Sequence, residues 1–162
     1  MPVCPIILFP DPILRQQAVD AALQDGSAQR TIQDLLDTLD SHMGVGIAAP
    51  QIGVGTRIIV VDATRAKRPV KNHGRLVLLN PTIISSTGNI AFREGCLSIP
   101  DMVARVTRAS NLVVEAMLVD GSPVSIHAEG FEAVILQHEI DHLNGVLFID
   151  RVRNARDIKI RE

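Results

Sequence analysis

The sequence predicts an α+β domain in which antiparallel sheets pack around a central helix with an H-E-x-x-H motif. Three observations support this fold class. One segment near the start of the chain and one near its end have apolar residues at helical spacing. Several short runs rich in Val and Ile lie between them, and Asp120-Gly121 reads as a hairpin turn. Helices that flank a block of strands are typical of the α+β class.

The chain is expected to form one domain over residues 1–162, since its length suits one core and no repeat or linker divides it. The formal net charge is only −2, and the sequence has four Phe but no Tyr or Trp. Nucleic-acid binding through a basic surface or stacked bases is therefore not expected. The two cysteines, with no secretion signal and no membrane-spanning run, favour a cytoplasmic protein without membrane contact.

The elements follow in order. An extended, proline-punctuated segment, Pro5–Pro12, precedes a helix predicted over 27–43, with Ser27 as its N-cap and a Gly44-Val45-Gly46 stop. The apolar face of this helix comprises Ile32, Leu35, Leu36, Leu39 and Met43. Strands are predicted over 56–62, 76–80, 103–107, 112–119 and 123–128. A second helix is predicted over 131–143, where Asn144-Gly145 ends it.

The second helix contains the H-E-x-x-H motif, His138 to His142. Residues at i and i+4 share a helix face, so both imidazoles can reach one ion, and Glu139 beside them can accept a proton from water. Two core histidines bonded to the backbone are the alternative. The intervening glutamate favours a metal site, and it predicts a metal-dependent hydrolase.

A hydrolytic site of this kind takes three protein ligands. In metalloproteases the third lies downstream, but residue 148 is Phe, and only Asp150, Asp157 and the terminal Glu162 follow the motif as acidic candidates. Cys96, within Glu94-Gly95-Cys96-Leu97-Ser98, supplies a thiolate. A free cysteine is more often simply buried. Because the two histidines need a third ligand and none of the usual type follows them, we favour Cys96 in that role.

Three segments occur in a fixed order: Gly44-Val45-Gly46-Ile47-Ala48-Ala49-Pro50-Gln51, then Glu94 to Ser98, then Gln137 to His142. Together they resemble the signature motifs of peptide deformylases. The similarity extends to Phe9–Arg15 and to 142–151, so it spans nearly the whole chain.

The resemblance implies an enzyme that removes the N-formyl group from the N-terminal methionine of nascent polypeptides. Cys96, His138 and His142 would hold one divalent ion, Fe²⁺ in the cell, with Ni²⁺, Co²⁺ or Zn²⁺ as alternatives. Glu139 would transfer protons, and the Gln51 amide and the Leu97 backbone N–H would stabilise the oxyanion. Helical spacing and the resemblance together place the methionine pocket at Val45, Gly46, Phe131, Val134 and Ile135.

The expected partners are N-formylmethionyl nascent peptides, with transient ribosome contact, and the chain is expected to be monomeric. Two other functions stay open from the residues alone. A peptidase would need a further ligand after His142, and a non-catalytic metal-binding relative would be expected to lack Glu139 or Gln51, both of which are present.

Overall fold

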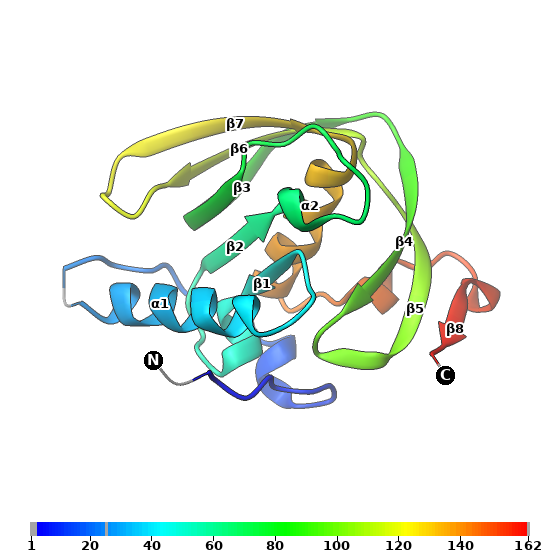
Figure 1. Ribbon diagram of the computed structural model, residues 1–162, viewed down its shortest axis with the longest axis horizontal. Helices are drawn as coiled ribbons and strands as arrows, with labels where there is room; N and C mark the ends of the chain where they lie inside the picture. The colour runs from blue at the N-terminus through cyan, green and yellow to red at the C-terminus, as the bar shows by residue number, and fades with distance from the viewer. Residues whose placement is uncertain (1–2, 25, 162) are drawn as a thin grey trace.

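The structure is a computed structural model that describes residues 3–24 and 26–161 (Figure 1). It has two α-helices, α1 (Ser27–Asp40) and α2 (Gly130–Leu143). A five-stranded sheet has the order β1 (Gly46–Ala48), β2 (Ile58–Asp62), β3 (Arg75–Thr87), β6 (Asn111–Met117) and β7 (Pro123–Glu129). A three-stranded sheet has the order β4 (Ile90–Cys96), β5 (Ile99–Arg108) and β8 (Ile158–Ile160). Both sheets are antiparallel.

Helix α2 lies between the two sheets, as the sequence predicted (Figure 1). It is buried on almost every side because it has two apolar stripes. Leu136, Ile140 and Leu143 join the core under the five-stranded sheet. Phe131 faces the other sheet, where its ring centroid lies 5.2 Å from that of Phe92 on β4. The predicted α+β class, with sheets around the H-E-x-x-H helix, is therefore confirmed.

Strand β2 holds the two helices on opposite faces. All five of its residues are buried. Ile59 and Val61 point into the core that contains α2, whereas Ile58 and Val60 point into the core that contains α1. This alternation is the ordinary two-residue period of a strand, and it explains why the run is apolar throughout.

The ends of the first helix differ from the prediction. The N-cap is Gly26, with a left-handed backbone (φ 79°), and Ser27 is the first helical residue. The helix stops at Asp40, so Met43 lies beyond it and is 95% exposed. The prediction included Met43 in the apolar face because its spacing is helical, and periodicity alone does not mark where a helix ends.

All five predicted strands are present, but β1, β4 and β8 were not predicted. Strand β1 is three residues long, and β4 contains a glycine and charged residues, so neither has strong strand propensity. Strand β8 exists because it pairs with β5, where Met102, Val103 and Ala104 face Ile160, Lys159 and Ile158. Among the described residues, no helix is long and apolar enough to cross a membrane.

Candidate active site

The three proposed ligands converge on one point although two elements supply them. His138 and His142 stand one turn apart on α2, and Cys96 ends β4. Their ligand atoms all lie within 4.8 Å of one another. The Cys96 Sγ is 3.3 Å from the His142 Nε2. Thiolate and imidazole are ligands that divalent Fe, Co, Ni and Zn accept, so the donor set fits a metal ion.

The orientation of His138 and the protonation state of His142 also fit a metal. The His138 Nδ1 lies 2.9 Å from the Glu94 Oε1, which leaves its other ring nitrogen for an ion. Burial lowers the pKa of His142, which keeps that imidazole neutral, as a ligand must be. The three residues therefore could hold one ion.

A buried network of charged side chains fixes the position of the ligand His138. Arg108 donates to both carboxylate oxygens of Glu94, at 2.6 and 2.9 Å, and to Asp141 at 2.9 Å. Asp141 also accepts bonds from Arg151. Desolvation raises the pKa of Glu94, but the hydrogen bonds with His138 and Arg108 outweigh it, so the pKa is lowered. Glu94 therefore stays ionised and fixes the orientation of His138.

Glu139 differs from the other acidic groups of the site. It is 4% exposed, and its Oε1 has no hydrogen-bond partner among the described residues. Burial raises the pKa of Glu139 to about 7, only partly offset by the charge of His138. A carboxyl with a pKa near neutrality is suited to accept and return protons.

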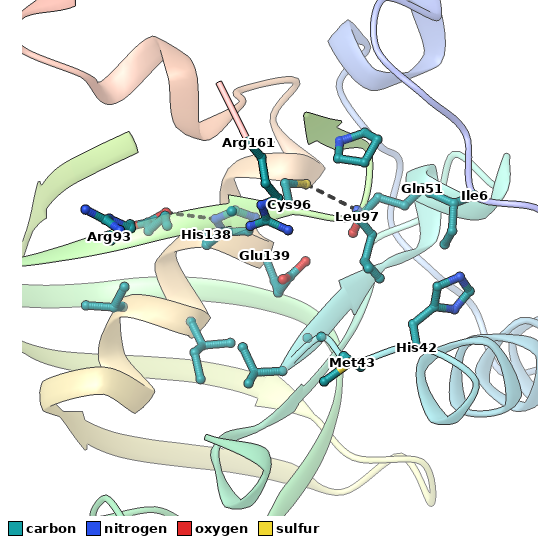
Figure 2. A pocket seen from close by; sticks show the side chains of 18 of the residues that line it. Ile6, His42, Met43, Gln51, Arg93, Cys96, Leu97, His138, Glu139 and Arg161 are labelled. Carbon is teal, nitrogen blue, oxygen red and sulfur yellow. Dashed lines mark hydrogen bonds and ion pairs between the residues drawn. The ribbon is translucent and has the colours of Figure 1, made fainter. Parts of the chain in front are cut away.

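Gln51 is held in a defined orientation beside Cys96. The Ala48 N–H donates to its Oε1 at 2.9 Å, so the Nε2 is the end that faces the ligands. That nitrogen donates to the Ser98 Oγ at 3.1 Å and lies 3.5 Å from the Cys96 Sγ (Figure 2). These contacts join a short 3-10 helix, Ala49–Ile52, to the end of β4, two segments that are far apart in the sequence.

A cavity of about 550 Å³ opens in front of these groups. All five residues of the expected methionine pocket line it, together with Gln51, Cys96, Leu97, His138 and Glu139. The structure adds lining residues that the sequence analysis did not identify: Ile6, Leu8, His42, Met43, Arg93, Pro100 and Arg161. They come from the N-terminal segment, the end of α1 and the three-stranded sheet, so no local pattern marks them.

Gly46 on β1 lies close to Ile135 and Glu139 on α2. A methyl group there would place its Cβ 2.8 Å from the Glu139 Oε2 and 3.1 Å from the Ile135 Cγ2. The Gly46→Ala variant is expected to displace Glu139 and to lower kcat/KM by about 10- to 100-fold for a formyl-Met peptide, the substrate that the motif resemblance implies.

Gly55→Ala is the matched control, because a Cβ at Gly55 would meet no atom within 4 Å. Steady-state kinetics of both variants would check the prediction. Equal activity in the two would show that the Gly46 contact with Glu139 does not matter.

Comparison with known proteins agrees with this geometry. Residues 3–157 match the family described as polypeptide deformylase. A peptide deformylase of Agrobacterium fabrum is 43% identical over 167 residues, which cover 100% of this chain and 95% of that protein. A crystal structure of a peptide deformylase from Legionella pneumophila is 41% identical, with a TM-score of 0.86, over 96% of this chain and 89% of that one.

A third relative carries a peptide. The Met-Ala-Ser-bound crystal structure of a class I type b peptide deformylase from Acinetobacter baumannii is 33% identical, with a TM-score of 0.86, over 93% of this chain and 99% of that one. Sequence, fold and ligand-forming residues thus lead to one assignment. The chain belongs to the polypeptide deformylase family, the hydrolases that remove the N-formyl group from the methionine at the start of nascent polypeptides.

Proposed function

We propose that Cys96, His138 and His142 hold one ion, Fe²⁺ in the cell, and that Glu139 transfers the protons of formyl hydrolysis. The placement of Glu139 is the observation that carries this proposal. Its buried carboxylate has an oxygen without a partner in the described part of the chain, and it lines the same cavity as Cys96 and His138. A general base must reach the reacting water, and this geometry provides for that.

The ion, when bound, would supply Lewis acidity, which lowers the pKa of water from about 15.7 to about 7. Glu139 accepts a proton from the attacking water as the oxygen of that water adds to the formyl carbon. It then donates that proton to the methionine nitrogen as the C–N bond breaks. The products are formate and a free amino terminus. Glu94 and Arg108 take no proton in this sequence; they hold His138 in place.

Two donors are proposed to stabilise the charge on the formyl oxygen. The Gln51 Nε2 is already directed at the ligand group by the bond from Ala48. Leu97 follows Cys96 directly and lines the cavity, and this supports its backbone N–H as the second donor. Loss of one donor of this kind typically costs about 10²–10³ in rate.

The methionine side chain is proposed to occupy the apolar part of the cavity. Phe131, Val134 and Ile135 come from the two helical turns before His138, and Val45 faces them from β1's side. The Gly46 backbone would hydrogen-bond the peptide. The Acinetobacter baumannii relative binds Met-Ala-Ser, a peptide that begins with methionine, and this supports the placement.

Metal removal tests the ligand assignment. Chelation should abolish hydrolysis of formyl-Met-Ala-Ser, detected through the freed amine, and Fe²⁺ or Ni²⁺ should restore it. Metal analysis should give one ion per chain, and none in a Cys96→Ala variant. Cys4→Ala is the control, because Cys4 is also a free thiol but lies outside the ligand group. Full activity in metal-free protein would contradict the proposal.

The choice of Fe²⁺ has its own test. A thiolate beside Fe²⁺ is vulnerable to oxidation, so the Fe²⁺ form should lose activity in air while the activity of a Zn²⁺ form should not change. Metal content of protein prepared without oxygen should show iron. Zinc in such a preparation, or an Fe²⁺ form that is stable in air, would count against iron.

We further propose that the chain acts as a cytoplasmic monomer with transient ribosome contact. Both cysteines are free, which suits a reducing compartment. Every residue assigned to the site comes from one chain, so the chemistry requires no second copy. Light scattering at working concentration would test the monomer.

A further inference from the structure

The three-stranded sheet carries an unpaired cluster of positive charge beside the cavity. Arg93 on β4 lies directly opposite Arg105 on β5, and Arg161 follows β8. All three are exposed. Among the residues that the structure describes, no carboxylate forms an ion pair with any of them. Adjacent like charges repel, so this arrangement favours an anionic ligand.

Arg161 is directed into the cavity by its backbone. The Arg161 N–H donates to the Asp101 O at 2.7 Å, which continues the pairing of β8 with β5. From there the side chain crosses β5 and reaches β4, where its Nη2 lies over Gly95. A Cβ at Gly95 would be 2.8 Å from that nitrogen, so the missing side chain provides the space. Arg161 thus extends toward Cys96 and His138 from the C-terminal segment (Figure 2).

Within the described ranges, no carboxylate that lines the cavity pairs with Arg93 or Arg161. Of the cavity's two described carboxylates, Glu94 is bound to Arg108 and His138, and Glu139 is buried on α2. An exposed arginine is usually just solvated. Here two of them line the same cavity as the apolar residues of the expected methionine pocket, and this placement would let them meet the part of a peptide that extends past the methionine.

We propose that Arg161, assisted by Arg93, binds a carboxylate in the residues that follow the formylmethionine. The enzyme would therefore prefer nascent chains with Asp or Glu at the second or third position. This inference rests on the proposed function, because it concerns the same cavity. A guanidinium suits this task because its planar donors match a carboxylate.

The test compares kcat/KM for peptides that differ in one side chain. Formyl-Met-Ala-Glu-Ser-amide, its Gln and Lys counterparts, and the same series at the second position would be assayed with one metal-loaded preparation. Of the two Glu peptides, we consider the one with the higher kcat/KM. Its kcat/KM should exceed that of its Gln counterpart by about threefold to fivefold, which lies within the range of an exposed ion pair. The ratio should fall toward one between about 0.01 M and 1 M salt.

Three variants localise the effect. Arg161→Ala should bring the Glu/Gln ratio close to one, and Arg161→Glu should reverse the preference in favour of Lys. Arg153→Ala removes the same charge from an exposed position outside the cavity, so its ratio should match that of the wild type. Arg153→Ala should also leave kcat for the Gln peptide unchanged, since Arg153 does not line the cavity.

The bound carboxylate could come from a Glu or Asp side chain or from the C-terminus of the peptide. Peptides with a free C-terminal carboxylate distinguish these two sources. If only the free acids show the preference, the arginines bind a chain terminus, and the proposed selection among nascent chains is wrong. A Glu/Gln ratio of one in the wild type, or a ratio that survives in Arg161→Ala, would also overturn the inference. Absence of turnover for the Gln peptide would instead contradict the proposed function itself, so the two failures are distinguishable.

Discussion

Replacing Glu139 with glutamine is expected to lower kcat for formyl-Met-Ala-Ser by about 10²–10⁴-fold, with the metal content unchanged. Glutamine has almost the same shape, so the packing of α2 between β1 and the ligand group should persist. What it loses is the ability to accept a proton. Glu139 is placed for that task because its Oε1 is buried without a partner and because it lines the cavity beside Cys96.

Glu132→Gln is the matched control for this variant. Glu132 is a second buried glutamate on α2, but it bonds His73 and does not line the cavity. Its kcat should stay close to that of the wild type, even if the protein becomes less stable. Single-turnover kinetics and metal analysis on both variants would check the result. An active Glu139→Gln enzyme with a full complement of metal would remove Glu139 from the mechanism.

Arg108→Ala is expected to reduce the free energy of unfolding by about 3–5 kcal/mol. Arg108 is 6% exposed and binds the carboxylates of both Glu94 and Asp141. Its removal leaves Glu94 without its guanidinium partner in a buried place, which is more costly than the loss of an equivalent pair at the surface. The melting temperature should fall by about 2–4 °C for each kcal/mol in a chain of this size.

Lys71→Ala gives the corresponding surface comparison. The Lys71 and Glu129 side chains are 75% and 52% exposed, and their ion pair spans 3.0 Å. Its loss should cost at most about 1 kcal/mol. Urea denaturation of both variants in metal-free form would keep metal binding out of the comparison. Equal losses in the two variants would mean that the buried network does not stabilise the fold.

Local patterns predicted the elements that have strong patterns of their own. Helix α2 was predicted because its two apolar stripes and its histidine pair share a 3.6-residue period, and β2 because it is apolar on both faces. Strands β4 and β8 were not predicted, since a strand with Gly95 and Glu94, or one of three residues, is stable only when it pairs with β5. Met43 was placed inside the first helix because apolar spacing alone does not mark the residue at which a helix ends.

The sequence by itself determined the ligand and proton-transfer candidates, because i, i+4 spacing on a helix and three ordered motifs are local features. It also indicated the fold class and the apolar wall of the cavity. Only the tertiary structure decided how close Cys96 comes to the histidines, how Arg108 joins Glu94 to Asp141, and where Arg161 lies. Those contacts join residues far apart in the chain, and their distances depend on how the sheets pack around α2, which no local pattern specifies.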